Sequence, residues 1–106
     1  MIIDRFAYIN VFILDIKTIE KISKALADTN RLKILLDMSN QGGKIQCAEI
    51  MSVIKLAQPS VSHHIKTLTE AGLIEAEKDG RTHSYNLNHS LLKAYSSWIN
   101  AIAGKE

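Results

Sequence analysis

Cysteine, proline and glycine are scarce in this sequence. Cys47 is the only cysteine, so the chain cannot form an internal disulfide, and this usage is typical of a reducing, cytoplasmic compartment. One proline and five glycines among 106 residues exclude a collagen-like or low-complexity chain. An apolar fraction of 46% is enough for a core at this length, so we expect one mostly α-helical domain over residues 1–106.

Long apolar runs and enzyme motifs are also missing. The charge-free N-terminal run from Phe6 to Leu14 is far shorter than the roughly 20 residues of a membrane span, and no basic region precedes it. We therefore expect neither a signal peptide nor a membrane partner. The chain has no glycine-rich phosphate loop, no nucleophile elbow and no paired carboxylates in a plausible cleft, which argues against an enzyme.

Charge of one sign is not in large excess. Thirteen Lys and Arg face eleven Asp and Glu, for a net charge of +2. Such a balance permits nucleic-acid binding without requiring it, because clustering on one face matters more than the total.

Helical apolar periodicity dominates the first 40 residues. Asp28 is a suitable N-cap for a helix that "NQGG" at 40–43 ends. In the stretch 2–13 the expected apolar stripe is Ile2, Phe6, Ile9 and Ile13. In the stretch 16–27 it is Ile19, Ile22, Leu26 and Ala27. In the stretch 29–39 it is Leu32, Leu35, Leu36 and Ser39. The β-branched residues of the first stretch also leave a strand possible there.

Two short helices with a tight turn follow. The first is expected over residues 47–54, with Ile50, Val53 and Ile54 facing inward, and the second over about 58–71. Pro59 fits the first turn of the second helix, and Gly72 fits the position just after its end. This arrangement over about 47–71 predicts a helix-turn-helix.

The period then changes from 3.6 to 2 over residues 73–87. Asp79-Gly80 in the middle favours a hairpin with a type I′ turn, which needs positive φ at both central residues. A last helix is expected from about Asn88 to Ala103. A helix-turn-helix followed by a β-hairpin is a winged helix, a mainly α fold with a hairpin wing.

Three stretches resemble one known family. The chain is similar to the ArsR/SmtB-type winged-helix repressors over about residues 19–102. The stretches that carry this resemblance are "ALADTNRLKILL" at 25–36, "PSVSHHIKTLTEAGLIEAEKDGRTHSYNL" at 59–87 and the apolar last helix. The resemblance implies a homodimer that reads a palindromic operator and releases it when an inducer binds, often a metal ion.

The adjacent histidines fall on different sides of the second helix. At 100° per residue, Val61, Ile65 and Leu68 form a buried face, His63 lies opposite, and His64 lies at the edge of the apolar face. We expect His64 to pack there with one nitrogen satisfied, or else to touch a backbone phosphate. The predicted DNA-binding residues of helix and wing are Gln58, Ser60, Ser62, His63, Lys66, Thr67, Lys78, Arg81 and His83. Glu75 and Glu77 in the wing would repel phosphate if they faced it.

The family's metal-ligand positions hold few ligands in this chain. The resemblance implies that they fall on Gln46 and Ala48 near the helix-turn-helix, and on His89, Leu91, Ile102 and Lys105 in and after the last helix. We therefore predict no metal and no cofactor, and the inducer is not identified. Cys47 is expected to be a small buried hydrophobe.

The ends of the chain carry more apolar surface than one small core can cover, which predicts a subunit interface. The residues expected in it are Phe6, Ile9, Ile13, Leu91, Leu92, Tyr95, Trp98, Ile99 and Ile102, within segments 2–27 and 88–103. The sequence thus predicts a homodimeric, sequence-specific transcriptional regulator that represses from a palindromic operator in double-stranded DNA. The alternatives are a metal- or redox-responsive repressor with a non-standard site, and a protein-interaction module that kept the winged fold.

Overall fold

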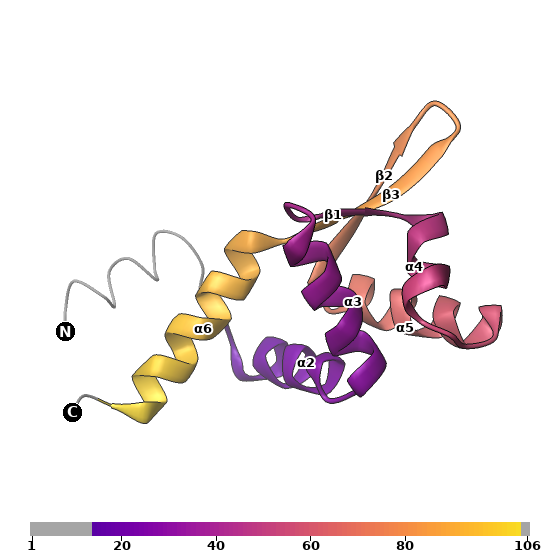
Figure 1. The fold of residues 1–106 in the computed structure, drawn as a ribbon. Helices are drawn as coiled ribbons and strands as arrows, with labels where there is room; N and C mark the ends of the chain where they lie inside the picture. The colour runs from indigo at the N-terminus through magenta and orange to yellow at the C-terminus, as the bar shows by residue number, and fades with distance from the viewer. Residues whose placement is uncertain (1–13, 105–106) are drawn as a thin grey trace.

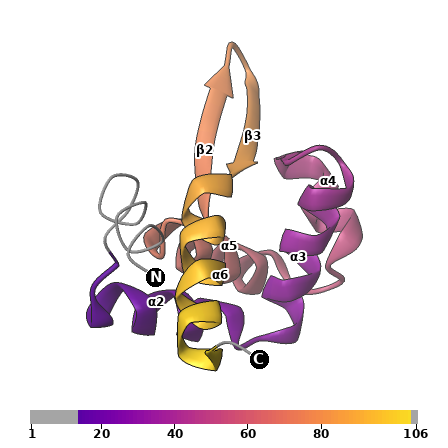
Figure 2. The same cartoon turned by 90° about the vertical axis from the view of Figure 1, so that its left-hand side faces the viewer.

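The fold is a winged helix. The computed structural model describes residues 14–104, so the predictions for Ile2, Phe6, Ile9, Ile13 and Lys105 lie outside it. The elements follow the order α2 (Ile16–Leu26), α3 (Thr29–Asn40), β1 (Lys44–Gln46), α4 (Cys47–Val53), α5 (Gln58–Glu70), β2 (Ile74–Asp79), β3 (Thr82–Leu87) and α6 (His89–Ala103). The hairpin β2–β3 rises away from the helices as a separate projection (Figures 1 and 2). No helix within residues 14–104 is both long and apolar enough to cross a membrane.

Aspartates cap the first two described helices. Asp15 accepts a hydrogen bond from the Thr18 backbone N–H at 2.8 Å and begins α2 (Ile16–Leu26). Asp28 accepts from the backbone N–H groups of Asn30 and Arg31 and begins α3 (Thr29–Asn40), as predicted.

The buried face of α3 differs from the predicted one. Leu35 is buried as expected, but Ile34 and Met38 fill the core with it, while Leu32 and Leu36 are 49% and 64% exposed. Several leucines in a row fit more than one helical stripe, so the sequence pattern could not identify which stripe faces the core.

The helix-turn-helix consists of α4 (Cys47–Val53) and α5 (Gln58–Glu70). Pro59 lies in the first turn of α5, where its missing N–H leaves no hydrogen bond unmade. At the other end, Gly72 adopts φ +82°, and the Leu73 N–H donates to the Leu68 carbonyl at 3.0 Å. Both positions confirm the sequence prediction.

The sheet has one more strand than predicted. β1 (Lys44–Gln46), β3 (Thr82–Leu87) and β2 (Ile74–Asp79) form an antiparallel sheet in the order β1-β3-β2. β1 has only three residues, too few for an alternating pattern to be recognised in a sequence. It joins the helix-turn-helix to the base of the wing.

The wing turn lies one residue later than predicted. Asp79 pairs with Thr82, so the two loop residues are Gly80 and Arg81 rather than Asp79 and Gly80. Gly80 has φ +65°, whereas no residue other than glycine among those described has a positive φ. A type I′ turn is therefore wrong here, because Arg81 does not take the second left-handed position. The shift puts Arg81 at the tip of the hairpin.

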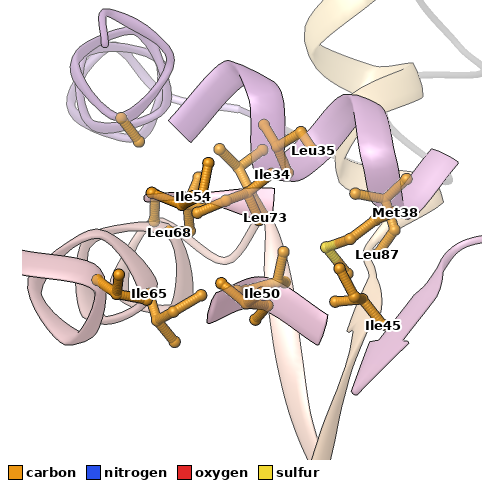
Figure 3. Close-up of a cluster of buried hydrophobic side chains, with 14 of the residues drawn as sticks. Ile34, Leu35, Met38, Ile45, Ile50, Ile54, Ile65, Leu68, Leu73 and Leu87 are labelled. Atoms are coloured by element: carbon orange, nitrogen blue, oxygen red, sulfur yellow. The ribbon is translucent and has the colours of Figure 1, made fainter. Parts of the chain in front are cut away.

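The core lies between α3, the helix-turn-helix and the base of the sheet. Ile34 and Met38 from α3 meet Ile50 from α4 and Leu68 from α5, and each of these four side chains is no more than 1% exposed (Figure 3). Ile45 of β1 and Leu87 of β3 close the end beneath the wing (Figure 3).

Helix α6 (His89–Ala103) lies on the side of α3 away from the helix-turn-helix (Figure 1). The Asn88 side chain accepts from the Leu91 N–H at 3.1 Å and donates to the Gly72 carbonyl at 2.9 Å, so it joins the start of α6 to the end of α5. A hydrogen bond of 2.7 Å between the Ser23 and Tyr95 hydroxyls joins α6 to α2.

Candidate nucleic-acid interface

Helix α5 has one buried face and two exposed edges. Val61, Ile65 and Leu68 are buried as predicted, while His63 is exposed. At 100° per residue, the four-residue spacing of Gln58, Ser62 and Lys66 puts them on one edge, and Ser60, His63 and Thr67 fall on the other. All six are exposed except Thr67, which is half-buried. The helix therefore presents polar donors and acceptors along its outer side.

His64 is buried and joins α5 to the start of α3. The residue is 9% exposed, and its Nδ1 lies 3.1 Å from Nη1 of Arg31. Arg31 also donates from Nε to the Ala25 carbonyl at 2.7 Å and from Nη2 to the Lys24 carbonyl at 3.2 Å. One guanidinium thus connects the end of α2, the start of α3 and the middle of α5. Of the two alternatives for His64, the packed histidine with a satisfied nitrogen agrees with these contacts.

The start of α3 places a second polar group beside His64. Arg31 can only donate, so Nδ1 of His64 is the acceptor in their contact. Oδ1 of the Asp28 carboxylate lies 3.9 Å from the same Nδ1, beyond hydrogen-bond distance. The Arg31 backbone N–H donates to Asp28, and this bond is the main reason why the pKa of Asp28 lies below its ordinary value.

The two faces of the wing differ in charge. Lys78 pairs with His83 and Ala76 with Tyr85, and strand alternation puts all four on one face of the hairpin. Ala76 and Tyr85 border the same hollow as α5, so this inner face is the one turned toward that helix. Glu75 and Glu77 alternate onto the outer face, so they do not oppose the approach of phosphate on the α5 side.

Glu77 is also paired on that outer face. It accepts a hydrogen bond from the Asn86 amide at 2.6 Å, and its Oε1 lies 3.3 Å from Nζ of Lys44 on β1. The Asn86 bond first and the Lys44 contact second hold the pKa of Glu77 below its ordinary value. Its charge is thus offset within the sheet, although the pair is exposed and contributes little to stability.

Cys47 is exposed, so the prediction of a buried hydrophobe is wrong. It is the first residue of α4, and the neighbouring core positions are taken by Ile45 before it and Ile50 after it. Burial raises the pKa of the Tyr85 hydroxyl, and the neighbouring Cys47 side chain raises it further. Within residues 14–104 no group of three or more His, Cys, Asp or Glu side chains could hold a metal ion.

The residues expected at a subunit interface have different environments. Leu91 is 5% exposed and belongs to the core of the monomer, so its side chain has no surface to offer a partner. Leu92, Tyr95 and Trp98 are half-buried along α6. Ile99 and Ile102 near its end are 44% and 64% exposed.

Sequence reasoning missed Arg31 as a support of α5. It lies within the stretch "ALADTNRLKILL", but its distance from His64 in the sequence gave no sign of contact. The only available signal was chemical, since a buried histidine needs a hydrogen-bond partner.

A helix-turn-helix with an exposed polar outer side, next to a hairpin with a cationic inner face, defines a winged-helix DNA-binding protein. A family model described as "Bacterial regulatory protein, arsR family" matches residues 28–76. The arsenical resistance operon repressor of Staphylococcus aureus is 36% identical over 86 residues, which make up 81% of this chain and 81% of that protein. The chain belongs to the ArsR family and is a DNA-binding transcriptional repressor, not an enzyme.

Two further similarities agree with this assignment. The transcriptional repressor SdpR of Bacillus subtilis is 33% identical over 76 residues, which are 72% of this chain and 82% of that protein. A crystal structure of an ArsR family transcriptional regulator is similar with a TM-score of 0.74 at 26% identity, over 85% of this chain and 91% of that one.

Proposed function

We propose that this repressor binds a palindromic operator as a homodimer in the cytoplasm, with one α5 helix in each of two successive major grooves. The observation that carries the proposal is the separation of the two histidines: His63 is exposed on the outer side of α5, and His64 fixes that helix through Arg31. A rigidly held helix with exposed polar side chains is what base reading requires.

The reading face consists of Gln58, Ser60, Ser62, His63, Lys66 and Thr67. Gln58 near the start of α5 suits a bidentate contact with adenine, and Lys66 suits guanine or phosphate. Lys78 and His83 on the inner face of the wing would add a cationic and a hydrogen-bonding group on the α5 side, and Arg81 at the tip would enter a narrow minor groove.

Exposed apolar surface on α2 and α6 supports the homodimer. Ile16 is 68% exposed at the start of α2, and Ile99 and Ile102 are 44% and 64% exposed on α6. Tyr95 and Trp98 stack beside them with ring centroids 6.4 Å apart. Packing these residues against their copies would remove apolar area from water and set two α5 helices about 34 Å apart, one turn of the duplex.

The signal that releases the operator is not arsenic bound by a thiolate cluster. The S. aureus relative is named for arsenical resistance, but a soft-metal site needs two or more thiolates, and one subunit of this chain has Cys47 alone. We therefore assign this chain to the repressors of the family that respond to another signal or to none.

The reading face is tested with the double variant Ser60→Ala, His63→Ala. After the preferred duplex has been selected from a random pool, we expect the variant to bind it about 1–3 kcal/mol more weakly, because two base contacts per subunit are lost. Binding to a scrambled duplex should change little, since phosphate contacts remain.

Ser39→Ala is the matched control, because Ser39 is exposed on α3 away from the reading face. Its affinity should equal that of the unsubstituted protein. Unchanged affinity and sequence preference in the double variant would show that this edge of α5 does not read bases.

The wing is tested through the salt dependence of binding. Replacing Lys78 and Arg81 with alanine should weaken binding to every duplex and reduce the slope of log K against log salt by about one per lost phosphate contact. Lys44→Ala removes one positive charge from the outer face, where Lys44 pairs with Glu77, and should leave the slope unchanged. Equal slopes for the inner-face and outer-face variants would exclude a role for the wing in DNA contact.

A further inference from the structure

A hollow of about 550 Å³ opens between α4, α5 and the inner face of the wing. Its floor consists of core side chains, among them Ile50, Val61 and Ile65. Ala48 of α4 and Ala76 of β2 border it with side chains too short to fill it.

The lining suits a small molecule. Ligand sites for small molecules have volumes of roughly 300–1,000 Å³, mostly apolar walls and a few polar groups. Here Met51 is 41% exposed at the hollow, an unusual position for a methionine next to a core. Tyr85 of β3 also borders the hollow; it is half-buried and supplies a hydroxyl group to the lining.

The side chains also indicate the class of ligand. Methionine sulfur and the Tyr85 ring make favourable contacts with aromatic rings. Lys66 and Glu70 border the hollow one helical turn apart, so their charges offset one another at its rim. An uncharged aromatic molecule with one hydroxyl group fits this lining better than an ion does.

We infer that this hollow binds a small, uncharged aromatic alcohol, and that binding there releases DNA. Gln58, Ser62 and Lys66 border the hollow and also form one edge of the proposed reading face. A molecule held between α5 and the wing would therefore engage side chains that DNA needs and would fix the wing relative to α5. The release of DNA, but not the binding of the molecule, rests on the proposed function.

Cys47 provides a built-in measurement of occupancy. It is the only thiol in the chain, it is exposed, and it borders the hollow. The rate at which it reacts with 5,5′-dithiobis(2-nitrobenzoate) is measured in the full chain against increasing 2-naphthol. We expect a saturable fall in rate with a half-maximal concentration on the order of 0.1 mM, as for a fragment-sized ligand. The anion 2-naphthoate should protect the thiol much less.

Two variants test whether the protected site is the hollow. Ala76→Phe fills the hollow, so 2-naphthol should no longer slow the reaction of Cys47. Met51→Gln removes the sulfur contact without changing the shape of the hollow, so the same protection should need a higher concentration of 2-naphthol. Ser39→Phe places a phenyl ring at an exposed position on α3, outside the lining of the hollow, and should leave the protection unchanged. Equal protection in all three variants, or stronger protection by 2-naphthoate, would overturn the assignment.

The link to DNA is tested separately with the selected duplex. 2-Naphthol should release it from the unsubstituted protein and from Ser39→Phe at the concentrations that protect Cys47, while Met51→Gln should need a higher concentration. Thiol protection without DNA release would overturn the coupling but keep the binding site. Intact DNA binding with no thiol protection would overturn the site and leave the proposed function standing.

Discussion

Leu68→Ala is expected to lower the free energy of unfolding by about 2–5 kcal/mol, the usual cost of truncating a fully buried leucine. The Leu68 side chain is completely buried between α5, α4 and α3 (Figure 3). Its loss removes transfer free energy and leaves a cavity, because the surrounding isoleucines cannot move in to fill the space. Urea unfolding at a fixed protein concentration measures the change, since the stability of the proposed dimer would depend on concentration.

Leu36→Ala is the matched control for this prediction. The substitution is the same, but Leu36 is 64% exposed on α3, so its free energy of unfolding should change by less than about 0.5 kcal/mol. The sequence pattern had instead assigned Leu36 to the buried face. A large effect at Leu36 together with a small one at Leu68 would contradict the helix orientations described above.

Arg31→Ala should be the most damaging substitution of a polar residue, with a loss of about 2–4 kcal/mol of stability. The guanidinium donates to the carbonyls of Ala25 and Lys24 and to His64. Hydrogen bonds from a charged donor contribute about 1.5–3 kcal/mol each when deleted singly, but the effects of three bonds to one group are not additive. Urea unfolding again gives the magnitude.

Arg31→Ala should lower DNA affinity by more than its loss of folding stability alone explains. Without Arg31, His64 loses the partner that fixes α5 relative to α3, so the reading face becomes less rigid. We expect Arg31→Ala to weaken binding to the selected duplex even at low temperature, where the protein is folded. Arg31→Lys should recover little, because an ammonium cannot donate along three directions in a fixed plane.

Arg81→Ala and Arg31→Ala should have different effects, because Arg81 is expected to contact DNA while Arg31 joins helices within the fold. Arg81 is exposed in the wing loop, so its removal should lower DNA affinity without changing the urea midpoint. Arg31→Ala should change both. If Arg31→Ala unfolded at the same urea concentration as the unsubstituted protein, the connection between α2, α3 and α5 would not hold the fold together.

Local chemistry determined much of what the sequence predicted correctly. Asp28, Pro59 and Gly72 act within a few residues of their own positions, as a cap, a helix start and a helix end. The winged-helix class and the burial of Val61, Ile65 and Leu68 followed from periodicity over one or two turns. The exposure of His63 followed from the same geometry, because adjacent helical residues point 100° apart.

Tertiary contact decided the remaining features. β1 is a strand because β3 lies beside it, and three residues have no strand signal of their own. Three further features depend on how neighbouring elements pack: which stripe of α3 faces the core, the exposure of Cys47, and the position of Leu91 in the monomer core.

His63 and His64 show what the local sequence determines and what tertiary contact determines. The sequence by itself established that His63 and His64 point to different sides of one helix, because the helical repeat is a local property of the backbone. Only the tertiary structure decided that Arg31, 33 residues earlier, holds His64. Hydrogen-bond partners of this kind are set by where two helices cross, and no periodicity within either helix records that crossing.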